Sequence, residues 1–350
     1  MFLKIVQPLR VYILLLVYTG AIVSMSRADT CKTQAQMLPS MREALSNEAR
    51  IIVAGVKTGD LPALQMETIP SVAADFSAVS ASVDSLKPLV QQASITIDNL
   101  YYLEASTVSA GATRTDFYCG SPVVALNFTD LPTGSYALVV LHATGVPQPQ
   151  QITLILSLTP QQKWMLAGLF SKPMTEAGHD GLWYWMSARD FSHKNMKWNA
   201  WFYYRIAADT LQPVEFLTSP NLDKLRSEED LVRPDNLPDA APLALVGRDS
   251  VFQVSMIDTT TVFGSLDLEL HYVPAADQAA QLRNPVTARQ QVTAAMQALL
   301  MLHPELRDAF HGIWVRADQG TASLYSLELP MDQILSEAPR AEATARSVPQ

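Results

Sequence analysis

Four residues near the middle of the chain have side chains that could perform acid-base or metal chemistry. Glu176, His179 and Asp180 lie within five residues of one another, and His193 follows 14 residues after His179. Imidazoles with nearby carboxylates can bind a metal ion or transfer protons. These four residues are therefore the catalytic candidates, and they would serve a hydrolase or a carbohydrate-binding protein.

A structural role for the same residues is the alternative, and the sequence favours it. Asp180 stands where it can cap a following helix, and Gly178 beside His179 is typical of a turn. The spacing between His179 and His193 also differs from the i, i+4 spacing that places two ligands on one face of a helix. We therefore predict no metal site here.

The signatures of the common enzyme classes do not occur in the sequence. It contains no Gly-x-Ser-x-Gly, no His-Glu-x-x-His, no phosphate-binding Gly-Lys-Ser/Thr loop and no dinucleotide-binding fingerprint. We therefore expect a non-enzymatic protein without a cofactor, which binds or scaffolds a protein or peptide partner. The hydrolase or carbohydrate-binding protein is the second hypothesis.

Aromatic residues gather between positions 183 and 204, where two helices are expected from residue 182 to residue 211. Most of these aromatics recur at helical spacing, which favours a place in a core. Trp183, Tyr184 and Tyr203 fall off the main apolar stripes. Because exposed Trp and Tyr faces can hold flat or apolar ligands, we predict these three as binding residues.

The same window resembles one tetratricopeptide repeat. Counted from Ala188, Phe191 follows at plus three, Ala200 at plus twelve, Tyr204 at plus sixteen and Ala207 at plus nineteen. These offsets match the packing positions of that family. The resemblance implies a helical hairpin at residues 176–212, and because no second copy follows, the hairpin must pack against a neighbouring domain.

Residues 31–175 form the first expected domain, in which helices precede strands. Helices are predicted at 41–54 and 71–91, and strands at 123–128, 136–142, 151–158 and 163–170. This order, with Trp164 in the closing strand, resembles the nuclear-transport-factor-2-like family. The resemblance implies a cone in which a curved sheet wraps around helices, and it carries over no functional residue.

The second half of the chain is expected to hold a linker and a small domain. Five prolines and a charged run at 226–230 indicate a connecting segment at 213–245. Residues 246–335 read as a strand pair, a helix and a second strand pair, and residues 336–350 as a disordered tail. The whole chain is therefore predicted to be of the α+β class.

The first 28 residues have the anatomy of a secretory signal peptide. Lys4 and Arg10 precede an apolar run of 15 residues from Val11 to Met25, and small residues lead to a cleavage position after Ala28. An uncleaved anchor is the alternative, but a membrane-spanning helix needs about 20 apolar residues. We expect a secreted or periplasmic protein with no stable membrane insertion after cleavage.

Two cysteines, Cys31 and Cys119, remain in the exported chain. In an oxidising compartment they can pair with none left over, so we predict a disulfide between them. A metal or redox pair is disfavoured, because the sequence has no Cys-x-x-Cys and no histidine beside either cysteine.

The net charge of the chain limits its partners. With 25 Lys and Arg against 34 Asp and Glu, the formal charge is −9, and the basic residues form no cluster. Nucleic-acid binding requires such a cluster, so we exclude it.

The Gly-His-Asp-Gly run at 178–181 and the aromatic run at 198–204 are similar to those of secreted bacterial proteins. This resemblance implies the compartment and no activity.

Overall fold

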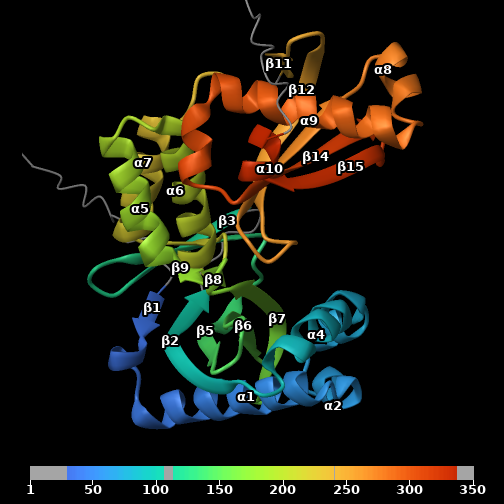
Figure 1. The fold of residues 1–350 in the computed structure, drawn as a ribbon. Helices are drawn as coiled ribbons and strands as arrows, with labels where there is room; N and C mark the ends of the chain where they lie inside the picture. Colours follow the sequence, from blue (N-terminus) through green and yellow to red (C-terminus); the bar gives the residue numbers. More distant parts are fainter. Residues whose placement is uncertain (1–29, 106–112, 240, 337–350) are drawn as a thin grey trace, which may run out of the picture.

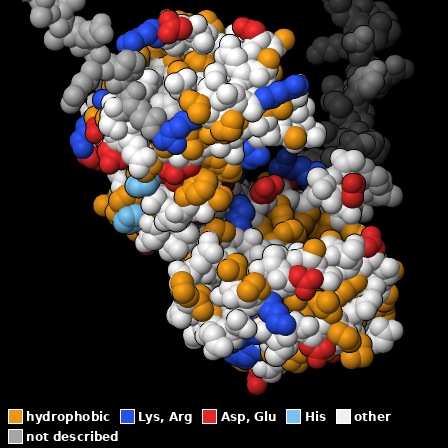
Figure 2. Space-filling view, turned by 45° about the vertical axis from the view of Figure 1, so that its right-hand side comes forward, with side chains coloured by type: hydrophobic (Ala, Val, Ile, Leu, Met, Phe, Trp, Pro, Cys, Tyr) orange, Lys and Arg blue, Asp and Glu red, His pale blue; other side chains and the backbone are white. Residues whose placement is uncertain are grey.

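The computed structural model describes residues 30–105, 113–239 and 241–336 (Figure 1). Its helices and antiparallel-rich sheets confirm the predicted α+β class. The described residues form an N-terminal lobe, and an upper lobe in which a group of helices packs against a C-terminal sheet unit. Figure 2 shows a hollow between the two lobes on one face of the molecule. The predicted signal peptide lies outside the described residues, as does the predicted tail after Ser336.

The N-terminal lobe consists of a short strand, a set of helices and then a run of strands. The first elements are β1 (Thr30–Thr33), η1 (Gln34–Gln36), α1 (Pro39–Thr58), α2 (Leu61–Met66), α3 (Pro70–Ala73) and α4 (Ser77–Val90). The strands are β2 (Ser94–Ala105), β3 (Arg114–Cys119), β4 (Val124–Thr129), β5 (Gly134–Thr144), β6 (Gln150–Leu158) and β7 (Trp164–Pro173). The four expected strands and the helix expected at 41–54 are present. The helix expected at 71–91 is divided into α3 and α4, and α2, β1, β2 and β3 are additional.

A five-stranded antiparallel sheet in the order β1-β2-β5-β6-β7 forms the centre of this lobe. Helices α1 and α4 cover one face of it. The residues that α1 buries in this core recur at helical spacing and include Leu45, Ala49, Ile52 and Val56. Gly59 caps the C-terminal end of α1, and its φ of 71° is a left-handed conformation that glycine adopts without strain. Figure 1 shows β2 as a strongly curved strand, with α1 running below the sheet.

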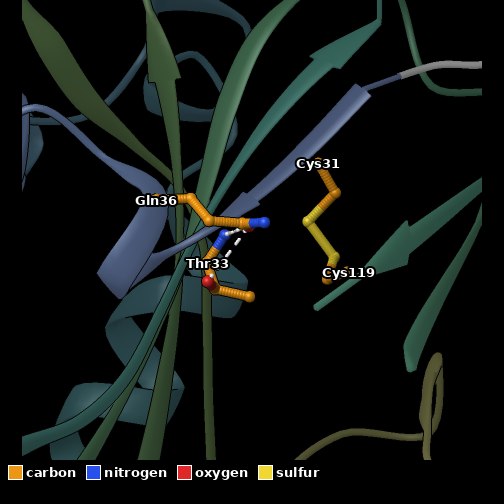
Figure 3. Close-up of a disulfide and its surroundings, with 4 residues drawn as sticks. All are labelled: Cys31, Thr33, Gln36 and Cys119. Atoms are coloured by element: carbon orange, nitrogen blue, oxygen red, sulfur yellow. Dashed lines mark hydrogen bonds between the residues drawn. A yellow bond between two sulfur atoms is a disulfide. The ribbon is translucent and has the colours of Figure 1, made fainter. Parts of the chain in front are cut away.

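The other face of this sheet packs against a three-stranded sheet with the strand order β10-β4-β3, in which β10 is Leu217–Thr218. Phe117 and Leu126 of the small sheet share a buried core with Leu138 of β5. The disulfide between Cys31 and Cys119 joins β1 to β3, with the two Cα atoms 5.1 Å apart (Figure 3). The predicted disulfide is therefore confirmed.

A helical group follows, consisting of β8 (Thr175–Glu176), β9 (His179–Asp180), α5 (Gly181–His193), α6 (Lys197–Leu211) and α7 (Pro220–Val232). Helices α5 and α6 make the expected hairpin, but the segment 213–245 is not an irregular linker, since it contains β10 and α7. Pro220 begins α7 after the Ser219 cap, and Leu222, Leu225 and Val232 are buried. Pro220 therefore marks the start of a helix.

The C-terminal unit has a five-stranded sheet covered by one long helix. Its elements are β11 (Leu243–Val246), β12 (Val251–Thr260), β13 (Asp267–Val273), α8 (Ala276–Gln281), α9 (Pro285–Leu302), η2 (Pro304–Asp308), β14 (Gly312–Gln319), β15 (Ala322–Pro330) and α10 (Met331–Ser336). The strand order is β11-β12-β13-β14-β15, and β13 and β14 are parallel because α9 connects them. A turn at Gly264, with φ of 86°, separates β12 from β13.

One hydrophobic core joins the α5–α6 hairpin to the C-terminal sheet and α9. Phe202 of α6 is fully buried and its ring centroid lies 5.6 Å from that of Phe310. The hairpin is thus covered by a neighbouring unit. Among the described residues, no helix is both long and apolar enough to cross a membrane.

Candidate functional site

The predicted histidines lie at opposite ends of α5. His179 is in β9, directly before the helix, and His193 is its last residue. At a rise of 1.5 Å per residue, these two positions are about 20 Å apart. The two imidazoles therefore cannot share a metal ion or act on the same bond of a substrate.

The two predicted carboxylates have structural partners. Asp180 accepts a hydrogen bond from the backbone N–H of Trp183 at 2.8 Å, and so caps α5. The Glu176 carboxylate accepts a hydrogen bond from the hydroxyl of Thr261, and its backbone carbonyl accepts one from the hydroxyl of Tyr184 at 2.9 Å. The structure therefore does not bring the four catalytic candidates together, because His193 is remote and both Asp180 and Glu176 have structural hydrogen-bond partners.

Two of the three predicted binding aromatics are buried. Tyr184 is 1% exposed and Tyr203 is 6% exposed, whereas Trp183 is 40% exposed and stacks on His179 with ring centroids 3.7 Å apart. The hydroxyl of Tyr203 donates to the carbonyl of Ala309 at 2.8 Å, and burial raises the pKa of Tyr203 to about 12. The expected exposure of Tyr184 and Tyr203 is therefore wrong, because each hydroxyl finds a backbone partner that allows burial.

A groove of about 710 Å³ lies along α1, where this helix meets the edges of β2 and β5. Its apolar lining includes Val53 of α1, Ile95 and Ile97 of β2, and Leu141 of β5. This volume falls in the range of ligand-binding clefts, and seven of the thirteen lining residues are polar or charged.

Basic side chains line the same groove. Arg42, Arg50 and Lys57 lie on one face of α1, because Arg50 and Lys57 follow Arg42 by 8 and 15 residues. The acidic Glu43 also lines the groove. Arg50 donates to the Asn47 amide oxygen at 3.1 Å and Lys57 to the Ala93 carbonyl at 2.8 Å. Within residues 30–105, 113–239 and 241–336, none of the three cations forms an ion pair with a carboxylate.

The groove was not predicted from the sequence. The spacing of the basic residues on the first helix was a usable signal, since positions i, i+8 and i+15 share a face. The other wall of the groove comes from β2, which was not predicted, so the sequence did not indicate that these cations border a cavity.

A second unpredicted cluster lies in the C-terminal sheet. One carboxylate oxygen each from Asp267 and Glu328 and one ring nitrogen of His311 lie within 4.8 Å of one another. Burial raises the pKa of Asp267, an effect that His311 and the Gly312 N–H oppose, and burial together with the Asp267 charge raises the pKa of Glu328. These residues are far apart in sequence, and no local motif connects them.

Comparison with protein-family models, with curated proteins and with solved structures gave no match. These comparisons therefore neither support nor contradict the resemblances to a tetratricopeptide repeat and to the nuclear-transport-factor-2-like family. The function is therefore inferred from the geometry of the α1 groove and of the C-terminal cluster.

Proposed function

We propose that this protein is an exported, non-enzymatic binding module, and that its α1 groove holds an acidic peptide segment of a partner protein. The observation that carries the proposal is the row of Arg42, Arg50 and Lys57 beside an apolar floor, without carboxylate partners among the described residues. Cations left unpaired along a groove favour an anionic ligand.

The length of the basic row favours an extended peptide over a small anion. Arg42 and Lys57 are 15 residues apart on α1, which corresponds to about 22 Å along the helix axis. An extended peptide covers that distance with about seven residues. The apolar residues Val53, Ile95 and Ile97 would contact the uncharged side chains of such a segment.

Charge supports specificity for this groove. The whole chain carries a formal charge of −9, so an acidic segment is repelled by most of the surface and attracted at the basic row. Long-range attraction of this kind increases association rates, and added salt weakens it.

The compartment is part of the proposal. The apolar run in residues 11–25 favours export, and the disulfide between Cys31 and Cys119 is stable in an oxidising compartment. The repeat-like hairpin of α5 and α6 has a supporting role in this proposal, because its aromatic side chains join it to the C-terminal unit.

The proposal is tested by fluorescence anisotropy with a fluorescein-labelled hexaglutamate peptide. The double variant Arg42→Glu/Arg50→Glu should weaken binding at least tenfold, equivalent to about 1.4 kcal/mol. The double variant Lys197→Glu/Lys224→Glu changes the net charge equally on exposed residues of α6 and α7, and it should bind like the unaltered protein.

A pair of uncharged variants tests occupancy of the groove itself. Ala54 lines the groove and is exposed, so Ala54→Trp should block the peptide, whereas Ala44→Trp on an exposed part of α1 outside the lining should not. Absence of peptide binding, or equal binding by Ala54→Trp and Ala44→Trp, would contradict the proposal.

A further inference from the structure

We propose that Asp267, His311 and Glu328 bind a divalent transition-metal ion of the Zn²⁺ type. Asp267 begins β13, His311 directly precedes β14, and Glu328 stands near the end of β15. Figure 1 shows α9 along the face of this sheet that is turned away from the N-terminal lobe. Leu268 and Ile313 point into the core with α9, so Asp267, which precedes Leu268 on β13, points to the opposite face.

Strand register brings the three side chains to one end of the sheet. Strands β13 and β14 are parallel with Leu268 beside Ile313, and β14 and β15 are antiparallel with Trp314 beside Glu328. Gly312 lies between the two carboxylates. A Cβ atom at Gly312 would lie 2.6 Å from Glu328 Oε1 and 3.0 Å from Asp267 Oδ1, so any larger residue would fill the space that the cluster occupies.

Two buried carboxylate oxygens of this cluster lack hydrogen-bond donors. Asp267 is fully buried, its Oδ1 lies 3.2 Å from His311 Nδ1, and its Oδ2 has no partner among the described residues. Glu328 Oε1 is also buried and without a donor in this part of the chain. Since an uncompensated buried charge is costly, a bound cation would supply the missing interaction for both carboxylates.

A neighbouring cluster on the same face shows how such groups are satisfied without a metal. The two ring nitrogens of His271 lie 2.5 Å from Asp318 Oδ2 and 2.9 Å from Glu269 Oε1. Arg316 donates to the same Glu269 oxygen at 3.2 Å. Because its charges are paired internally, this second cluster serves as the matched control.

The donor set determines the class of ion. One imidazole nitrogen and two carboxylate oxygens suit first-row divalent ions such as Zn²⁺, whereas Ca²⁺ takes six to eight oxygen ligands. In a tetrahedral zinc site the ligand atoms lie about 3.3 Å apart. The three ligand atoms here lie within 4.8 Å of one another, so side-chain rotations can bring them to that separation. The His311 side chain is 53% exposed, and it leaves a route from solvent to the site.

The test is isothermal titration with ZnCl₂ on the full, chelator-treated protein without a histidine tag. We expect one Zn²⁺ per chain and a rise in melting temperature on saturation, both retained in Glu269→Gln. Asp267→Asn and Glu328→Gln should weaken Zn²⁺ binding at least tenfold. Because it removes a buried charge, Asp267→Asn should also melt at a higher temperature than the unaltered protein when metal is absent.

His311→Gln keeps the test decisive if a buried variant fails to fold, since this side chain is largely exposed. It should retain the far-ultraviolet circular dichroism spectrum and lose the thermal stabilisation by Zn²⁺. Stoichiometric Zn²⁺ binding that is equal in His311→Gln and Glu269→Gln would overturn the proposal. Absence of stoichiometric binding by the unaltered protein would also overturn it.

Discussion

Arg189 on α5 and Glu228 on α7 form a two-pronged ion pair. Arg189 Nε donates to Glu228 Oε2 at 2.7 Å, and Nη2 donates to Oε1 at 2.8 Å. The indole N–H of Trp185 donates to the same Oε2 atom at 2.8 Å. These three hydrogen bonds connect α7 to α5 of the hairpin. The hydrogen bonds from Arg189 are also the largest cause of the lowered pKa of Glu228.

Glu228→Gln is expected to lower the free energy of unfolding by about 1 kcal/mol, a value that allows for solvent screening of the 38% exposed Arg189 side chain. Urea denaturation measures the change. Asp190→Asn is the control, because Asp190 pairs with Lys194 at 2.7 Å with both side chains more than half exposed. That variant should change the free energy by less than about 0.5 kcal/mol, and equal losses in the two variants would contradict the role of Glu228.

The same ion pair should be pH-dependent. The pKa of Glu228 in the folded protein lies below its ordinary value of 4.5, so its stabilisation is present above pH 4.5 and is lost as the pH falls through the folded pKa. The difference in unfolding free energy between the unaltered protein and Glu228→Gln should therefore shrink below pH 4.5. Denaturation series at several pH values measure it, and a constant difference down to pH 3 would count against this linkage.

Tyr203→Phe tests whether the hairpin aromatics are structural. Removing the hydroxyl leaves the Ala309 carbonyl without its donor at 2.8 Å and should cost about 1 kcal/mol of stability. Binding of the hexaglutamate peptide should be unchanged, because Tyr203 lies outside the α1 groove. Loss of peptide binding in a folded Tyr203→Phe protein would show that the hairpin contributes to the binding site.

Phe202→Ala tests whether the hairpin and the C-terminal unit share one core. Removing this fully buried ring should lower stability by about 3 to 5 kcal/mol. Hydrogen exchange should accelerate in α6, α9 and β14, whereas β5 and β6 belong to a different core and should keep their protection. Acceleration confined to α5 and α6 would mean that the two units unfold independently.

The disulfide is expected to stabilise the N-terminal lobe. Replacing Cys31 and Cys119 by serine should lower the free energy of unfolding by about 4 kcal/mol, because the bond closes a loop with a sequence separation of 88. The double variant should show no response to a reductant, since the chain contains no other cysteine. Equal stability of the oxidised and reduced forms of the unaltered protein would contradict this prediction.

Local sequence patterns predicted several elements well. The apolar periodicity of α1 and α9 and the strict alternation in β6 are properties of neighbouring residues, and these elements are present in the structure. The alternation in β2 is interrupted by a register shift between Ile97 and Asn99, so this strand was missed. Its absence from the prediction also concealed the second wall of the α1 groove.

Burial and pairing of the polar groups depended on contacts between distant segments. Tyr184 and Tyr203 were predicted to be exposed because they lie off the apolar stripes, but their hydroxyls reach carbonyl groups that the sequence does not identify. The approach of Asp267, His311 and Glu328 likewise depends on the register of three strands.

By itself, the sequence determined the α+β class, most helices and strands, and a cysteine pair with no competing partner, because periodicity, helix caps and residue counts are local or compositional properties. Only the tertiary structure decided that the α5–α6 hairpin is buried against the C-terminal unit and that residues 220–232, expected in a linker, form α7. It also decided that the cations of α1 line a groove and that Asp267 and Glu328 lie beside His311. The physical reason is that hydrogen-bond partners, solvent exposure and charge neighbours are set by how strands align and helices pack, and residues far apart in the chain then share one environment.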